Sequence, residues 1–350
     1  MNRLQQLFGI DLPLIQAPMA GAQGAKLAIA VSNAGGLGSL PCAMLTPDAM
    51  KKELNEIRAQ TAKPYNVNFF CHTPPVPSDE REARWRATLA SHHNEFGIDA
   101  ANIPAGPGRA PFTYEAADVL SEFKPAVVSF HFGLPSSTLM QRVRAWGGKI
   151  ISSATTVDEA RWLEDHGVDA IIAQGLEAGG HRGIFLGDDL TTQVGTFALL
   201  PQIVKAVKVP VIAAGGIADA NGVAAALALG AAGVQIGTAY LLCPEASTSA
   251  VHRAALKSDG ARFTELTNVF TGRPARGIVN RLMREHGPIN HETPPFPLAA
   301  AAVAPLRAKA ESQGSGDFSP LWSGTNPSGC KEISASLLTL ELAKHCRLAI

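Results

Sequence analysis

The 350-residue chain has few cysteines, few aromatic residues and no excess of charge of either sign. Its five cysteines are dispersed, and none belongs to a CxxC pair. An odd, scattered set of this kind argues against a disulfide framework and against a structural zinc site. We therefore expect no metal site, reduced thiols and a cytoplasmic protein.

The charge balance excludes two classes of partner. Lysine plus arginine equals aspartate plus glutamate at 30 each, and the sequence contains no long basic run. A nucleic-acid surface needs a basic stripe, and binding to a membrane surface needs a basic amphipathic helix. No apolar run is long enough to span a bilayer, and the N-terminal segment does not read as a secretory signal. We expect neither nucleic acid nor membrane as a partner.

Apolar residues are plentiful in this chain, at 46% against 17% charged residues, so a large buried core is expected. Alanine and glycine are abundant, whereas aromatic residues make up only 6%. This composition favours an α/β protein over a β-sandwich. The length fits one barrel-sized domain with an appendage, or two domains.

Eight short apolar segments alternate with helical patterns between Leu12 and Tyr240. The segments are Leu12–Met19, Leu37–Leu40, Tyr65–Cys71, Ala126–Phe132, Lys149–Ser153, Ala170–Ala173, Val209–Ala214 and Gly233–Ile236. Alternation of strands and helices predicts a parallel sheet, and eight units predict a closed (β/α)8 TIM barrel. A doubly wound open sheet is the weaker alternative, because no GxGxxG motif follows the first strand.

The remaining segments suggest a division of the chain into three parts. Residues 1–243 form the predicted barrel, interrupted at about 73–112 by a proline-rich insertion with a charged helical stretch from Asp79 to Glu95. Residues 244–325 are predicted to form a smaller, mostly helical cap domain over the barrel mouth. Residues 326–350 contain an amphipathic helix, predicted over 333–348, that returns to the barrel.

The predicted ligand site lies at the carboxyl ends of the strands, where TIM barrels place their active sites. Gly215-Gly216 and Gly237-Thr238 follow the last two strands, and both pairs precede helix starts. Backbone N–H groups there, together with a helix N-terminus, bind a phosphate without a lysine. The simpler alternative is that these glycines only form tight turns.

Two histidines are predicted at the barrel mouth. His181 ends the glycine-rich loop AIIAQGLEAGGHRG, and His131 ends an earlier strand. An imidazole in either place is a candidate acid or base, although each also has a purely structural interpretation. The other histidines on helices or in the cap are predicted to be solvated: His92, His93, His166, His252, His286, His291 and His345.

Seven motifs appear in one fixed order along the chain: QAPMAG, GGLGSL, NVNFF, VVSFHFG, AQGLEAGGHRG, PVIAAGGI and GVQIGTAYL. Together they resemble the nitronate monooxygenases (formerly 2-nitropropane dioxygenases), and more narrowly their bacterial class I branch. The resemblance implies an FMN-dependent enzyme that oxidises alkyl nitronates, such as propionate 3-nitronate or the nitronate of 2-nitropropane, with dioxygen to a carbonyl compound and nitrite. Nitroalkanes and nitronates would be its small-molecule partners, and a monomer or homodimer is expected.

The resemblance also implies roles for particular residues. His181 matches the position of the catalytic base, and His131 matches a second active-site histidine. Pro18 and Met19 would flank the isoalloxazine ring. The residues that would hold FMN are Asn68, Gln174, Gly179, Gly180, Gly215, Gly216, Gln235, Ile236, Gly237 and Thr238.

One segment departs from the family pattern. Class I enzymes often have tyrosines and a lysine in the cap, but PFPLAAAAVAPLRAK has no tyrosine, and its only charges are Arg307 and Lys309. Arg307 either pairs with an anionic substrate or faces outward. Three alternatives to the predicted function stay open: an FMN-dependent NAD(P)H:quinone or enoyl reductase on the same barrel, a phosphate-sugar isomerase or lyase without flavin, and a non-catalytic binding protein.

Overall fold

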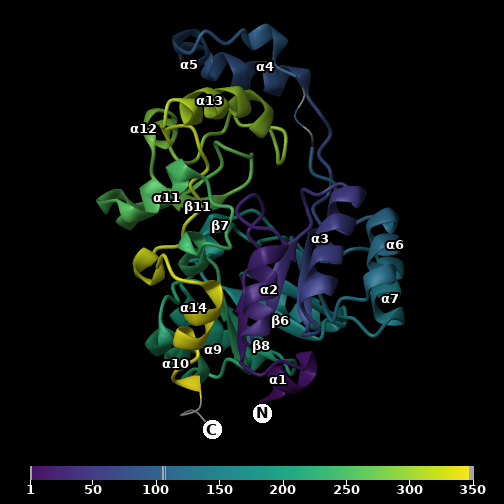
Figure 1. The fold of residues 1–350 in the computed structure, drawn as a ribbon. Helices are drawn as coiled ribbons and strands as arrows, with labels where there is room; N and C mark the ends of the chain where they lie inside the picture. The colour runs from purple at the N-terminus through teal and green to yellow at the C-terminus, as the bar shows by residue number, and fades with distance from the viewer. Residues whose placement is uncertain (1, 105, 107, 347–350) are drawn as a thin grey trace.

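A closed parallel barrel occupies the lower half of the computed structural model, which describes residues 2–104, 106 and 108–346 (Figure 1). Its strands, in their order around the sheet, are β1 (Leu14–Gln16), β9 (Gly233–Ile236), β8 (Val211–Ala214), β6 (Ala170–Gln174), β5 (Lys149–Ala154), β4 (Val127–His131), β3 (Tyr65–Phe70) and β2 (Gly38–Pro41). A bridge between Ile15 and Leu37 joins β1 to β2 and closes the ring. The predicted (β/α)8 barrel is confirmed.

Helices surround the barrel and connect its strands. They are α2 (Ala25–Asn33), α3 (Pro47–Gln60), α6 (Tyr114–Phe123), α7 (Ser137–Ala145), α8 (Val157–Asp165), α9 (Thr196–Ala206) and α10 (Ala220–Ala228). An unpredicted short helix, α1 (Arg3–Phe8), lies at the amino-terminal end of the barrel. No helix in the described part of the chain is both long and apolar enough to cross a membrane.

The C-terminal helix packs against a helix of the barrel. α14 (Ala335–Leu342) packs beside α2, where Ser336 Oγ donates to Ala30 O at 2.9 Å. The buried hydroxyls of Tyr240 and Thr339 lie 2.8 Å apart and link this helix to the segment that follows β9. The helix is shorter than the predicted 333–348, and the predicted end at residue 348 lies outside the described residues.

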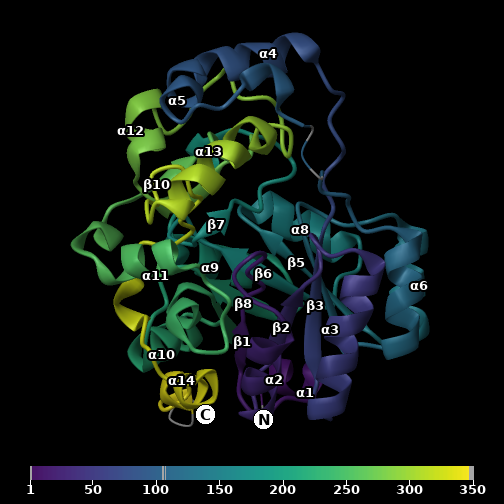
Figure 2. The same cartoon turned by 45° about the horizontal axis from the view of Figure 1, so that its top comes forward.

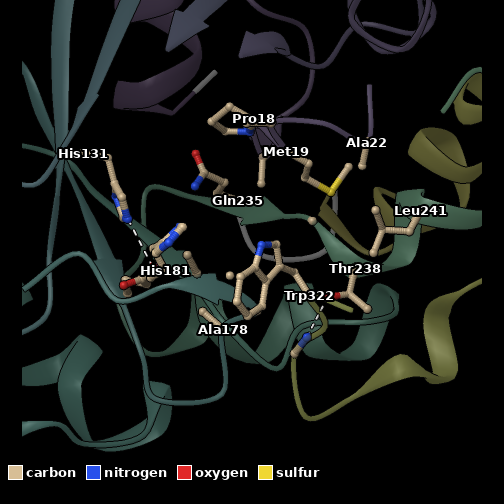
Figure 3. Close-up of a pocket in the computed structure, with 18 of the residues that line it drawn as sticks. Pro18, Met19, Ala22, His131, Ala178, His181, Gln235, Thr238, Leu241 and Trp322 are labelled. Atoms are coloured by element: carbon tan, nitrogen blue, oxygen red, sulfur yellow. Dashed lines mark hydrogen bonds between the residues drawn. The ribbon is translucent and has the colours of Figure 1, made fainter. Parts of the chain in front are cut away.

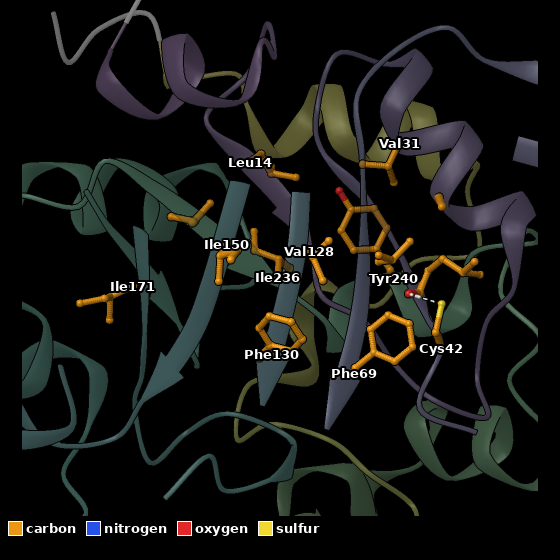
Figure 4. Packing of buried hydrophobic residues seen from close by; sticks show 14 of the residues in the cluster. Leu14, Val31, Cys42, Phe69, Val128, Phe130, Ile150, Ile171, Ile236 and Tyr240 are labelled. Atoms are coloured by element: carbon orange, nitrogen blue, oxygen red, sulfur yellow. Dashed lines mark hydrogen bonds between the residues drawn. The ribbon is translucent and has the colours of Figure 1, made fainter. Parts of the chain in front are cut away.

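The barrel has apolar residues on both sides of its strands near its amino-terminal end. Leu4 and Phe8 of α1 pack with Ile15, Ile151 and Ile212 inside the ring. Outside the ring, a larger cluster fills the space between strands and helices; Figure 4 shows side chains of β4 in it beside Tyr240. Because the lower interior is filled, a ligand can enter only from the carboxyl-terminal end.

A second layer covers that open end (Figures 1 and 2). We call it the cap and define it as α4 (Asp79–Thr88), α5 (Ala90–Glu95), α11 (Ala250–Lys257), α12 (Arg281–His286), α13 (Ala300–Ser312) and the strands β10 (Thr264–Thr267) and β11 (Ala275–Ile278). The strands were not predicted. They pair antiparallel with each other, and β11 also pairs with β7 (Gly180–His181) from the loop after β6.

The insertion after β3 belongs to the same packing unit as the cap. Its predicted helical stretch forms two helices, α4 and α5, which meet at Leu89. Trp85 is 1% exposed, and its Nε1 donates to Ala299 O at 3.2 Å. Around it, Leu89, Phe270 and Phe318 form one hydrophobic cluster with residues of α12 and α13. We therefore propose to count the insertion with the cap rather than with the barrel.

Replacing Trp85 with alanine is expected to lower the free energy of unfolding by about 3–5 kcal/mol, because a large side chain is removed from a packed interior. Urea unfolding of the wild type and of Trp85→Ala measures this loss. Val76→Ala in the same insertion, at a side chain that is 88% exposed, is the control and should change stability by less than about 0.5 kcal/mol. Equal, small effects of both substitutions would contradict the shared core.

Candidate active site

A cavity of about 270 Å³ lies between the carboxyl ends of the strands and the cap (Figure 3). The structure brings every predicted site residue to its wall. These residues are Pro18, Met19, Asn68, His131, Gln174, Gly179, Gly180, His181, Gly215, Gly216, Gln235, Ile236, Gly237 and Thr238. They come from six barrel strands or the loops that follow them, so the barrel places them together although they are distant in sequence.

The loop after β6 is held in place by a buried arginine. Arg182 is 0% exposed, and its guanidinium donates to the carbonyl oxygens of Gln174 and Gly175 at 2.8 and 2.7 Å. A third bond runs to Gln193 Oε1 at 3.0 Å. Burial lowers the pKa of Arg182 only to about 10, so the group stays charged at neutral pH. The carbonyls it binds fix the start of the loop that carries His181.

Gln174 uses both ends of its amide on the same loop. Its Nε2 donates to His181 O at 3.0 Å, and its Oε1 accepts from Gly183 N at 2.7 Å. Gln174 thus lines the cavity while its polar atoms are engaged within the protein. Its contribution to the site is to set the position of the His181 backbone.

His131 supports the same carbonyl from β4. Its Nε2 lies 3.1 Å from His181 O and therefore donates, because a carbonyl oxygen only accepts. Its Nδ1 then accepts from the Ser153 hydroxyl at 3.0 Å. Burial lowers the pKa of His131 to about 3, so the ring is neutral at physiological pH. With both nitrogens occupied, His131 has the bonding of a positioning residue.

His181 is surrounded by aromatic rings and is neutral as well. Phe70, Phe132, Phe296 and Trp322 have ring centroids 5.2–6.2 Å from that of its imidazole. Burial holds the pKa of His181 well below its usual value, and the positive charge of Arg109 lowers it further. A proton-accepting role fits this environment better than a permanent positive charge.

The cap selects one tautomer of His181. Its Nε2 lies 2.9 Å from the hydroxyl of Thr271, in the turn between β10 and β11. That hydroxyl donates to Arg273 O at 3.4 Å, so it accepts from the imidazole. Nε2 therefore carries the proton, and Nδ1 keeps the lone pair. Among the described residues, none hydrogen-bonds to this Nδ1.

The glycine loops of β8 and β9 form one wall of the cavity. Gly215 and Gly216 have φ values of 117° and 74°, which side chains rarely tolerate, so glycine is required there. The segment after the cap closes over them: Gly324 N donates to Thr238 Oγ1 at 2.9 Å, and Asn326 Nδ2 donates to Gly216 O at 3.2 Å. The backbone in this wall is thereby fixed before a ligand arrives.

Gln235 of β9, which lines the same cavity, has an unpaired hydrogen-bond acceptor. Its Oε1 is buried and has no hydrogen-bond partner in the described part of the chain. In Figure 3 the side chain lies beside Pro18 and Met19. A buried amide oxygen of this kind is costly unless a ligand supplies an N–H or O–H donor.

Asn68 is positioned by a polar network inside the upper barrel. Its Nδ2 donates to Ser129 Oγ at 2.9 Å, and the same hydroxyl accepts from Asn66 Nδ2 at 2.9 Å. Asn66 also donates to Ser39 Oγ at 3.0 Å. Three neighbouring strands therefore hold Asn68 at the edge of the cavity.

Several cavity residues were not found from the sequence. Trp322, Gly324 and Asn326 come from a turn-rich segment, whose glycine and asparagine content was the available signal. Arg109 comes from the insertion, where no periodic pattern marks it. Arg307 does line the cavity, but it also pairs with Glu311 at 2.8 Å.

The prediction of solvated histidines is wrong for three of them. His252 is 8% exposed and lines the cavity, so His131 and His181 are not alone at the mouth. His92 and His93 are 2% and 1% exposed because α5 packs against α12 and α13, and His93 Nε2 donates to Ala302 O at 2.9 Å. His166 and His291 are exposed, as predicted.

The barrel, the cap and a ligand cavity at the carboxyl ends of the strands define a TIM-barrel enzyme. The family model described as "Nitronate monooxygenase" matches residues 1–344. A nitronate monooxygenase of Paraburkholderia phytofirmans is 42% identical over 353 residues, spanning 99% of this chain and 95% of the relative. One from Pseudomonas aeruginosa is 39% identical over 354 residues, spanning 99% of both chains.

A solved structure agrees with these sequence matches. Nitroalkane oxidase from Streptomyces ansochromogenes superposes with a TM-score of 0.90 at 37% identity, covering 99% of this chain and 98% of that one. The chain therefore belongs to the nitronate monooxygenase family, and it is an oxidoreductase.

The imidazole rings of His131 and His181 are expected to stay neutral from about pH 5 to 8, a range in which an unperturbed histidine titrates. Nitrogen NMR of histidine-labelled protein should show no midpoint near 6.5 for either ring, with the proton on Nε2 in both. A normal midpoint for His181 would contradict the proposed desolvation.

The low pKa of His131 also has a consequence for stability. The unfolded chain binds more protons than the folded one between pH 6.5 and about 3, so the free energy of unfolding falls as pH is lowered through this range. His131→Asn removes this source of acid sensitivity. Thermal unfolding should therefore show the difference in stability between wild type and variant shrinking as the pH is lowered from 7 to about 4.

Proposed function

We propose that this enzyme oxidises alkyl nitronates with FMN and dioxygen to a carbonyl compound and nitrite. Small nitronates, such as propionate 3-nitronate or the nitronate of 2-nitropropane, and dioxygen are its partners, in a cytoplasmic monomer or homodimer. The observation that carries the proposal is a neutral, half-buried His181 in the wall of a cavity that also offers glycine amide hydrogens and an unpaired amide oxygen.

The residues present fit a flavin mononucleotide. A phosphate suits the wall formed by Gly215, Gly216, Gly237 and Thr238, because backbone N–H groups beside helix starts bind anions without a lysine. The unpaired Gln235 Oε1 suits a ring N–H donor. Bound there, the flavin supplies the electron-transfer chemistry, and the protein supplies binding, orientation and charge.

The protein's own contribution to the reaction centres on His181. Its Nδ1 lone pair can accept the α-proton of a neutral nitroalkane, since Thr271 keeps the proton on Nε2. The surrounding rings exclude water and keep the imidazole from being protonated in advance. His131 and Gln174 fix the backbone of His181 and touch its carbonyl rather than the reacting atoms.

The cofactor is tested by releasing it from the purified protein. Heat denaturation followed by chromatography should yield FMN at about one equivalent per chain. Release of FAD, or a colourless protein that does not take up added FMN, would contradict the proposal and favour the isomerase or lyase alternative. Bleaching by NADH without oxygen, with no bleaching by nitronate, would favour the reductase alternative.

Replacing His181 with asparagine separates proton abstraction from the later steps. For a neutral nitroalkane, kcat/KM is expected to fall by about 10²- to 10⁴-fold, the usual contribution of a general base. For the preformed nitronate, which has already lost the proton, the loss should be much smaller. His166→Asn, at an exposed ring outside the cavity, is the control. Equal losses with both substrates would show that His181 is not acting as a base.

A further inference from the structure

Most arginines near the cavity already have partners. Arg182 binds three oxygens of its own loop, as described above. Arg276 donates to Leu176 O at 2.8 Å and to Thr264 O at 3.1 Å. Arg273 donates to Ile184 O and lies 3.9 Å from the centre of the Phe132 ring. None of these three guanidinium groups lines the described part of the cavity wall.

Arg109 differs from these three arginines both in its partners and in its position. It lines the cavity, and no described residue accepts a hydrogen bond or forms an ion pair with its guanidinium. The guanidinium lies over the face of Phe296, whose ring centre is 5.4 Å from Cζ. A guanidinium presents five donors in a planar arrangement, so a half-buried one without an acceptor is well suited to an anionic ligand.

The second cation on the wall is less available. Arg307 is bound to Glu311 at 2.8 Å, and its side chain is 45% exposed. Its charge and that of Arg109 lie close enough to disfavour each other, because Arg307 contributes to the lowered pKa of Arg109. Both cations face the cavity, but only Arg307 is neutralised by a carboxylate. The cavity therefore has a net attraction for an anion.

We propose that Arg109 binds a planar, two-oxygen anionic group of the substrate and so determines which substrates the enzyme accepts. This inference rests on the proposed function. The bound group is either the nitronate group itself or a carboxylate elsewhere on the same molecule, because both present two oxygens in one plane. Phe296 supports the guanidinium from one side and leaves its edge for the ligand.

The position of Arg109 relative to His181 gives this role a physical reason. His181 is neutral and cannot hold an anion by charge, whereas Arg109 is close enough for its charge to lower the pKa of that imidazole. The barrel thus supplies a base and the cap supplies a cation. Both residues line the same cavity, so a substrate anchored on Arg109 would share it with the imidazole of His181.

The test compares wild type, Arg109→Gln and Arg109→Lys as flavin-loaded enzymes with two substrates. One substrate is the nitronate of 2-nitropropane, which has a single anionic group; the other is propionate 3-nitronate, which also has a carboxylate. Arg109→Gln is expected to raise KM by about ten- to a hundredfold, with a much smaller change in kcat, because a charge-assisted hydrogen bond is lost. Arg109→Lys should recover part of the loss, since it keeps the charge but not the planar geometry.

The two substrates identify the group that Arg109 binds. A raised KM for both supports binding of the nitronate group, and a raised KM for propionate 3-nitronate alone supports binding of the carboxylate. Unchanged KM values for both, in a wild type that oxidises nitronates, would overturn the inference. Arg84→Gln removes an exposed arginine from the same insertion and should change KM by less than about twofold.

A binding measurement keeps the inference separate from the proposed function. Calorimetric titration with nitrate, an inert planar anion, should show weaker binding to Arg109→Gln by about ten- to a hundredfold. Equal nitrate affinity in wild type and Arg109→Gln would overturn the inference even if nitronates prove to be the wrong substrates. Thermal midpoints that agree within a few degrees establish that the variant is folded.

Discussion

The hydrogen bonds of Arg182 are the constraint on which the site depends. A fully buried guanidinium must satisfy its donors within the protein, and it does so on the carbonyls of Gln174 and Gly175 and on Gln193. Its own backbone N–H donates to Pro274 O at 2.9 Å, beside β11. One residue therefore holds the loop after β6 against the barrel on one side and the cap on the other.

The short strand β7 joins the same loop to the cap. Gly180 and His181 pair with Arg276 and Ala275, so the backbone of the catalytic candidate is an edge of the cap's sheet. Its side chain is bound by Thr271 of the cap, and its carbonyl is bound by His131 and Gln174 of the barrel. The imidazole is thus fixed by both layers, and neither layer alone would define its position.

The sequence was a good guide where physical causes are local. Eight buried parallel strands produce continuous apolar runs, and positive φ values demand glycine at Gly215 and Gly216, so both features could be read directly. The sequence was a poor guide where long-range packing determines whether a side chain is buried. His92, His93 and His252 carry polar side chains on short helices, a pattern that indicates solvent exposure, yet α5 and α11 are covered by other parts of the cap.

The strands β10 and β11 were missed for a related reason. Each has only four residues, and β11 also pairs with a two-residue segment nearly a hundred residues away, so no local pattern indicates the sheet. Arg109 left no signal either, because an isolated arginine in a proline- and glycine-rich loop resembles a solvated surface residue. Its place in the cavity follows from how α4 and α5 dock around Trp85, a contact that joins residues more than 200 positions apart. Such placement depends on the assembled cap rather than on neighbouring residues.

The pairing of a neutral base with a nearby cation has a consequence for the order of events at the site. In the free enzyme the charge of Arg109 adds to desolvation and keeps His181 unprotonated, so the lone pair on Nδ1 is available. When a carboxylate carried by a nitroalkane substrate neutralises Arg109, that repulsion falls, and the same imidazole would become more basic. Binding of the substrate to Arg109 would therefore raise the basicity of the His181 imidazole when a proton has to be removed. A cavity that held a permanently protonated histidine would bind anions equally well but would have no lone pair with which to start the reaction on a nitroalkane.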